Sequence, residues 1–111
     1  MKIIPFNPSL SSRQSLSVNL GEAVINFYFV WNVRDSSWYV DLSNTETEIL
    51  SVKMLPNSNL LPINNKLING NFRVLNVKNS EYEIITYDNF GSVFQLMYGT
   101  NEEWSKIDGS L

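Results

Sequence analysis

Residues 22–43, EAVINFYFVWNVRDSSWYVDLS, decide the fold of this chain. Apolar side chains occupy both alternating faces of residues 22–32, and residues 37–43 repeat the period of two that a strand requires. If Asn32 lies opposite Ser37, the register places the large apolar side chains of both strands on one face. The predicted framework of this antiparallel hairpin is Phe27, Phe29, Trp31, Trp38, Val40 and Leu42.

The rest of the sequence extends this hairpin into an all-β domain. The chain has 111 residues, the size of one domain, with a 13% aromatic content and a single alanine, Ala23, which favours strands over helices. Six or seven short antiparallel strands indicate a small β-barrel or a two-layer β-sandwich, and both architectures remain open. Beyond the hairpin, the strands are predicted at 15–20, 47–55 (a sheet edge), 72–77, 82–86 and 92–98, with an ordered loop over 56–70 packed against the core.

The two ends of the chain differ from this central region. Pro5 and Pro8 exclude a helix and disfavour a central strand, so residues 1–14 are predicted to form an extended N-terminal arm. Residues 15–98 form the single β domain. Residues 99–111 are predicted to be a mobile C-terminal tail whose one large apolar side chain is Trp104.

The residue types exclude most familiar catalysis. With no Cys and no His, the chain lacks thiolates, the usual metal ligand and the usual general base at neutral pH. A pair of carboxylates could act on a glycosidic bond or several could hold Ca²⁺, but no calcium-loop motif occurs, nor does any phosphate-binding glycine motif. We therefore expect no enzyme, no metal and no cofactor, and we expect turn or surface positions for the acids Asp35, Asp41, Glu46, Glu48 and Asp88.

Charge and hydropathy exclude two kinds of partner. The net charge is −3, and the few cations available for a phosphate backbone are Arg34, Lys53, Lys66, Arg73 and Lys78, so we expect no nucleic acid. No apolar run approaches the roughly 18 residues of a membrane span, so we expect no membrane association and a soluble intracellular product. Trp31, Trp38 and Tyr39 could form a sugar-binding platform, although aromatic residues at alternating strand positions are more often core.

Landmarks along the chain resemble a known family. They are Ile4-Pro5, the strand 16–21 ending in Leu-Gly, the aromatic strand ending in Trp31-Asn32, the segment Trp38-x-x-Asp41-Leu42, the apolar series Ile49, Leu55, Leu60 and Leu61, and Asp88-x-Phe90-Gly91 before Leu96-x-Tyr98. In this order they resemble the baseplate plug family, small tail proteins of the contractile-tailed cyanophage type. The resemblance covers about residues 3–98.

The resemblance implies a function that composition does not. It implies a non-enzymatic structural protein of a phage or prophage virion, made in the host cytoplasm and placed in the tail baseplate as a plug or hub component. Such a protein packs against other tail or baseplate proteins, with self-association into a homo-oligomer left open. The expected docking residues are Ile3, Ile4, Phe6 and Trp104. The alternatives are a small carbohydrate- or ligand-binding β module that uses Trp and Tyr side chains, and an oligonucleotide-binding barrel.

Overall fold

The hairpin of residues 22–43 forms as its pattern predicts. Strands β3 (Val24–Asn32) and β4 (Ser37–Ser43) pair antiparallel, with Trp31 opposite Trp38, Phe29 opposite Val40 and Phe27 opposite Leu42. The predicted register is therefore confirmed. A shift by one residue would turn these side chains from the core to the opposite face, which is why the pattern fixes the pairing so firmly.

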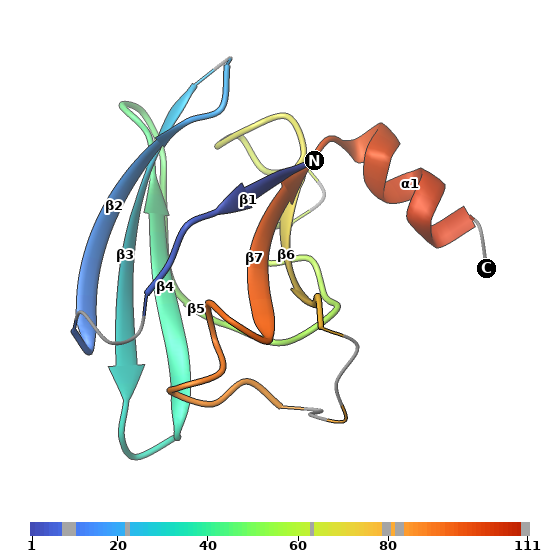
Figure 1. The fold of residues 1–111 in the computed structure, drawn as a ribbon. Coiled ribbons are helices and arrows are strands. Elements are labelled where there is room, and N and C mark those ends of the chain that lie inside the picture. Colours follow the sequence, from blue (N-terminus) through green and yellow to red (C-terminus); the bar gives the residue numbers. More distant parts are fainter. Residues whose placement is uncertain (8–10, 22, 63, 79–80, 82–83, 110–111) are drawn as a thin grey trace.

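Two antiparallel sheets make up the fold (Figure 1). The structure is a computed structural model that describes residues 1–7, 11–21, 23–62, 64–78, 81 and 84–109. One sheet has the order β2-β3-β4-β5 and the other the order β1-β7-β6. The remaining bounds are β1 (Lys2–Ile4), β2 (Arg13–Asn19), β5 (Glu48–Lys53), β6 (Asn71–Asn76), β7 (Phe94–Gly99) and one helix, α1 (Asn101–Gly109).

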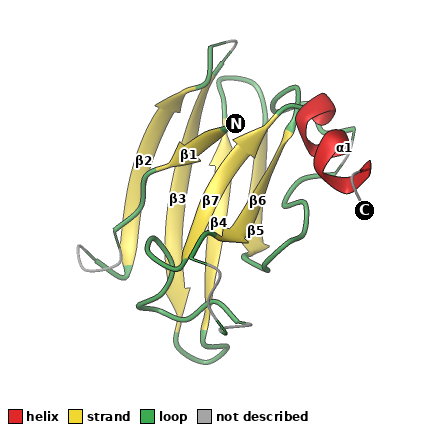
Figure 2. Ribbon diagram, turned by 45° about the vertical axis from the view of Figure 1, so that its right-hand side comes forward, coloured by secondary structure: helices red, strands yellow, loops and turns green. Residues whose placement is uncertain are grey.

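These sheets form the two layers of a sandwich. Their strands run in broadly similar directions (Figure 2), and the ring of Phe27 in one sheet meets that of Phe72 in the other edge to face at 5.3 Å. No strand pairing among the described residues closes the sheets into a barrel. The structure is mostly β, as predicted, with one short helix in addition, and of the two predicted architectures the sandwich matches the pairing.

The long segment between β5 and β6 is an ordered loop against the core, as predicted. Its leucines Leu60, Leu61 and Leu67 are buried with Ile68, although Ile63 lies outside the described residues. The side-chain oxygen of buried Asn71 accepts the backbone N–H of Leu61 at 3.0 Å, and its amide donates to the Leu61 carbonyl at 2.8 Å. Asparagine side chains thus replace the backbone partners that a strand would provide.

The strand predicted at 82–86 is wrong for the residues that are described. Residues 82–83 lie outside the described part of the chain, and residues 84–86 are in no strand. The cause is Asn89, whose side chain accepts the backbone N–H of Thr86 at 2.7 Å and donates to the Ile84 carbonyl at 3.0 Å. These local bonds take backbone groups that a strand partner would need. Strand β6 pairs instead with β7, which lies at the centre of its sheet.

Both chain ends are more ordered than the sequence predicts. The arm contributes edge strand β1, which pairs with β7. The mobile tail expected over 99–111 is wrong for the described residues, because 101–109 form α1; residues 110–111 lie outside the described part of the chain. The helix lies on the far side of the three-stranded sheet from β2, β3 and β4 (Figure 1). Among the described residues, no helix has the length and apolar character to cross a bilayer. The domain limits at 15 and 98 stay predictions.

Candidate docking surfaces

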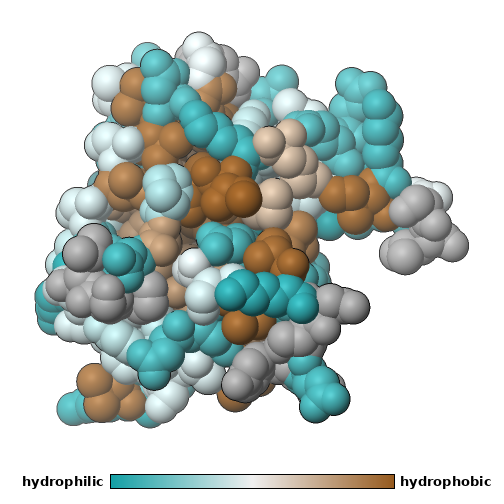
Figure 3. All heavy atoms as spheres, viewed as in Figure 1, coloured by the Kyte–Doolittle hydropathy of each residue, from teal (hydrophilic) through white to brown (hydrophobic). Residues whose placement is uncertain are grey.

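The N-terminal arm divides its apolar residues between the core and the surface. Ile4 is fully buried, whereas its neighbour Ile3 is 52% exposed. The alternation follows from pairing with β7, because Ile4 lies opposite buried Leu96 and Ile3 lies opposite Met97 on the outer face. Hydrophobic atoms gather at the surface over β1 (Figure 3). Of these two predicted docking residues, only Ile3 presents its side chain outward.

Phe6 packs within its own chain. Its ring lies 4.8 Å from Phe29, 4.9 Å from Trp38 and 4.4 Å from Phe90, measured between ring centroids. Aromatic pairs in such edge-on and tilted arrangements add about 0.5–1.5 kcal/mol each beyond burial. The arm therefore covers one side of the core, and the Phe6 ring stabilises the fold of its own chain.

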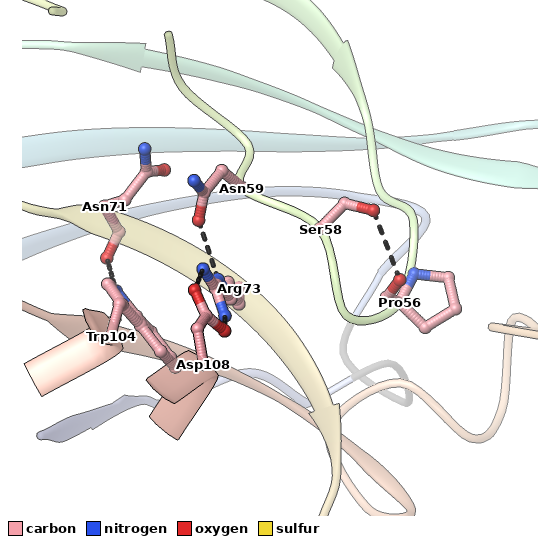
Figure 4. Close-up of polar contacts among 7 residues, drawn as sticks. All are labelled: Pro56, Ser58, Asn59, Asn71, Arg73, Trp104 and Asp108. Atoms are coloured by element: carbon pink, nitrogen blue, oxygen red, sulfur yellow. Dashed lines mark hydrogen bonds and ion pairs between the residues drawn. The ribbon is translucent and has the colours of Figure 1, made fainter. Parts of the chain in front are cut away.

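Trp104 also packs within the chain, which the expectation of a mobile tail did not anticipate. The indole is only 3% exposed, and its Nε1–H donates to the Asn71 carbonyl at 3.0 Å (Figure 4). The Arg73 guanidinium lies 4.6 Å from the centre of the ring. Gly99 makes room for the indole, since a Cβ there would lie 2.7 Å from it. Trp104 thus attaches α1 to the sheet.

A capping box starts the helix and is the sequence signal that was missed. Thr100 Oγ1 accepts the backbone N–H of Glu103 at 3.1 Å, and Glu103 Oε1 accepts the N–H of Thr100 at 2.9 Å. The other Glu103 oxygen lies 2.5 Å from the N-terminal ammonium of Met1. That ammonium, followed by the Thr100 N–H, lowers the pKa of Glu103 from its ordinary value. The T-N-E-E sequence at 100–103 therefore marks the start of α1.

An ion pair holds the other end of the helix. Arg73 donates two hydrogen bonds to Asp108, each 2.9 Å long, and a third to Asn59 Oδ1 at 2.7 Å (Figure 4). The bidentate geometry fixes the orientation of both side chains. The Asp108 hydrogen bonds hold the pKa of this carboxyl below its usual value and raise that of Arg73.

This pair sets an expected pH dependence. Asp108 has an ordinary pKa of 3.8 that is lowered on folding, so it stabilises the fold above that pH and loses this contribution as the pH falls through the folded-state pKa. We expect Asp108→Asn to be less stable than the parent at pH 7, by an amount that shrinks in high salt. Urea midpoints of the two proteins should converge in acid; a gap that persists to about pH 2 would contradict this account.

The alternative of a sugar-binding platform is not supported by the positions of its aromatic residues. Trp38 is fully buried, and its ring stacks on Tyr87 at 5.1 Å and meets Trp31 at 5.5 Å. Tyr39 points to the opposite face of β4, where its hydroxyl donates to Asp35. Trp38 therefore has no open ring face for a ligand, and its Nε1–H is a buried donor without a partner among the described residues.

Of the predicted acids, Asp41 and Glu48 border one surface hollow, and Asp35 is in an ion pair with Lys53. The Asp35 carboxylate accepts from the Tyr39 hydroxyl and lies 3.2 Å from Lys53. The Tyr39 hydrogen bond, followed by Lys53, lowers the pKa of Asp35, and the same hydrogen bond raises the pKa of Tyr39. Asp41 accepts the backbone N–H of Ser51 at 2.7 Å. Nowhere in the described part of the chain do three acidic side chains gather as a metal ion would require. Of the five cations considered for nucleic acid, Lys53 and Arg73 are in ion pairs with carboxylates.

These features define a class: a small two-sheet β-protein with a packed arm and an attached helix, whose surface hollows measure about 290–340 Å³. A family model described as "Cyanophage baseplate Pam3 plug gp18" matches residues 1–102, so the chain belongs to this family of baseplate plug proteins. The resemblance predicted from the sequence is thereby confirmed. The match ends inside α1. No curated protein matches the chain.

Proposed function

We propose that this protein is a non-enzymatic plug or hub component of a phage or prophage tail baseplate, held in the virion by packing against other tail proteins. The family match over residues 1–102 carries the proposal. A baseplate must withstand assembly and firing, which calls for stability in place of turnover. The extensive aromatic core and the two packed chain ends support such a role.

The state of the carboxyl groups supports a role without catalysis. Where a shift is resolved, in Asp35, Glu103 and Asp108, the pKa lies below its ordinary value. Each of these groups is held by a cation or by a hydrogen-bond donor. A general acid at neutral pH needs the opposite shift, which burial without a partner produces. These carboxylates are suited to stay charged.

The outer face of the three-stranded sheet is the proposed contact with a neighbouring tail protein. We define the Ile3 patch as Ile3 and its cross-strand partner Met97. Ile3 is an exposed apolar side chain on a paired strand. Because the strand pairing already fixes its backbone, little conformational entropy is lost when a partner protein covers it. The patch thus places an exposed apolar side chain of the arm on a paired strand of the sheet.

Mass spectrometry of density-purified particles tests the proposed location. We expect the chain at a fixed number of copies relative to other tail proteins. Its absence from particles whose other tail proteins are well covered would overturn the baseplate proposal.

A charge in the patch tests the proposed contact. Ile3→Asp should fold normally, because the side chain points outward, but should reduce incorporation into particles by about tenfold or more. Leu50→Asp is the matched control, since Leu50 is similarly exposed, at 57%, on the other sheet. Equal incorporation of both variants would exclude the Ile3 patch as a contact while leaving the location intact.

A further inference from the structure

Four strand edges border the two sheets, and three of them are protected. The chain itself covers β6, because Asn57 N–H donates to Val74 O at 2.9 Å and Leu60 N–H to Phe72 O at 3.0 Å. A register shift interrupts β5, where Ser51 has a φ of 57°. Strand β1 has only three residues. Short length, bulges and covering segments are the usual devices that keep strand edges from pairing with other chains.

Strand β2 has none of these protections. Its seven residues, RQSLSVN, pair with β3 in unbroken register from Arg13 opposite Val30 to Asn19 opposite Val24. The strand contains no proline and no bulge. In both ribbon views no described segment runs along its outer edge (Figures 1 and 2). It is therefore a long, regular and open edge.

The hydrogen-bond pattern shows which backbone groups this edge presents. Ser12 O accepts from Trp31 N–H, and Leu20 N–H donates to Ala23 O, so the even-numbered residues of the strand face β3. The odd-numbered residues point their N–H and C=O groups to the open side. Of these, Arg13 N–H donates to Ser11 Oγ and Asn19 O accepts from Lys2.

Between those two ends lie Ser15 and Ser17. Their outward backbone groups have no hydrogen-bond partner in the described part of the chain. Their side chains are small and lie on the outer face of the sheet, so nothing bulky would stand between this edge and an incoming strand. An approaching chain could therefore bond directly to the centre of β2.

We propose that the occupant of this edge is β2 of a second copy, paired antiparallel about a two-fold axis at Leu16. Outward-facing residues must pair with outward-facing residues, so Ser15 lies opposite Ser17 of the other copy and Arg13 opposite Asn19. In this register the seven residues of one strand lie opposite the seven of the other, and the open backbone groups of Ser15 and Ser17 supply the new hydrogen bonds, since Arg13 N–H and Asn19 O are already bonded. Arg13, the only charged residue of the strand, then lies opposite Asn19 and not opposite Arg13 of the other copy, so the two like charges are kept apart.

Side chains on the inner face favour the same arrangement. Leu16 borders a hollow of about 290 Å³ that also has Phe6 and Phe29 in its lining. In the proposed register each Leu16 lies beside Leu16 of the other copy, at the rim of both hollows. Apolar surface that is open in one copy becomes covered by the other, and the two four-stranded sheets become one continuous sheet. This self-pairing requires no baseplate protein and is independent of the proposed function.

Engineered cysteines test the register directly, because the chain has no natural Cys. Leu16 faces itself in a non-hydrogen-bonded pair, where Cα atoms lie about 4.5 Å apart, within the disulfide range. We expect Leu16→Cys to give a covalent dimer under mild oxidation. Leu50→Cys, on the edge strand β5, is the control for random collisions, since Leu50 is the more exposed residue. Equal or faster crosslinking at position 50 would overturn the register.

Sedimentation equilibrium tests the association without a crosslink. Ser17→Pro removes one outward backbone N–H and no backbone bond to β3, and edge strands tolerate proline at such positions. It also removes the hydrogen bond that Ser17 Oγ donates to Asn26 Oδ1 in β3, so Ser17→Ala, which loses only that side-chain bond, is the matched control. We expect the parent chain to dimerise and Ser17→Pro to associate at least tenfold more weakly with an unchanged far-UV spectrum. A parent chain that stays monomeric to about 1 mM would overturn the proposal. If the parent chain is monomeric and Ser17→Pro also reduces its incorporation into particles, the partner of this edge is a strand of another protein.

Discussion

Trp38→Ala should lower the free energy of unfolding by about 3–5 kcal/mol, the range for truncating a large aromatic residue in a core. Trp38 is fully buried and touches the rings of Phe6, Trp31, Tyr87 and Phe90. Removing it leaves a cavity between the hairpin and the arm that neighbouring rings cannot fill. Urea denaturation monitored by circular dichroism measures the change.

Two further variants separate the causes of this loss. Trp38→Phe should cost less than Trp38→Ala, since it keeps an aromatic ring and removes a buried Nε1–H that has no partner in the described part of the chain. Tyr28→Ala, on the outer face of β3, is the control. It should lower the free energy of unfolding by only about 1 kcal/mol, the effect of replacing a residue with high strand propensity by alanine at an exposed position. A loss below about 1 kcal/mol for Trp38→Ala would show that the ring does not fill the core.

Trp104→Ala should have the second largest effect, about 3 kcal/mol, and should release the helix. The indole is the one buried side chain of α1 and fills the space beside Gly99. A helix of nine residues is marginal in water without such tertiary contacts. Hydrogen exchange should therefore show lost protection over residues 101–109, while the strands keep theirs.

The control for this variant lies on the same helix. Ser105→Ala changes an exposed residue next to Trp104 and slightly improves helix propensity, so stability should stay within about 0.5 kcal/mol. If α1 remained protected in Trp104→Ala, the Arg73–Asp108 pair and the capping box would have to be its main attachments. That result would contradict the role assigned to the indole.

The four-stranded sheet was predictable from sequence because its information is local. Consecutive strands pair with one another, and the aromatic pattern of residues 22–43 leaves one register that buries Phe27, Phe29 and Trp38 together. The edge position of β5 also followed from its weak alternation. Period-two patterning carries both facts, so no knowledge of distant residues was needed.

The three-stranded sheet and the surface were much less predictable. Pairing of β1 with β7 joins residues at opposite ends of the chain, which no local pattern records. The helix has a single buried residue, Trp104, so its apolar periodicity is too weak to detect. Of the predicted docking residues, Ile4, Phe6 and Trp104 contribute to the chain's own packing. Their apolar content suggested contact with a partner protein, but composition could not show that these side chains pack within their own chain.

The pairing of β1 with β7 also determines when the molecule can finish folding. The β2–β5 meander can form as soon as it leaves the ribosome, because its contacts are local and loop closure is cheap. Its aromatic face must then wait for the three-stranded sheet, because β1 and β6 both pair with β7, which is complete only after residue 99 is synthesised. During that interval the nascent chain exposes Phe27 and Phe29 together with an open β2 edge, a state prone to aggregation. Slower translation or chaperone binding in this window should therefore affect the yield of protein more than the stability of the finished fold.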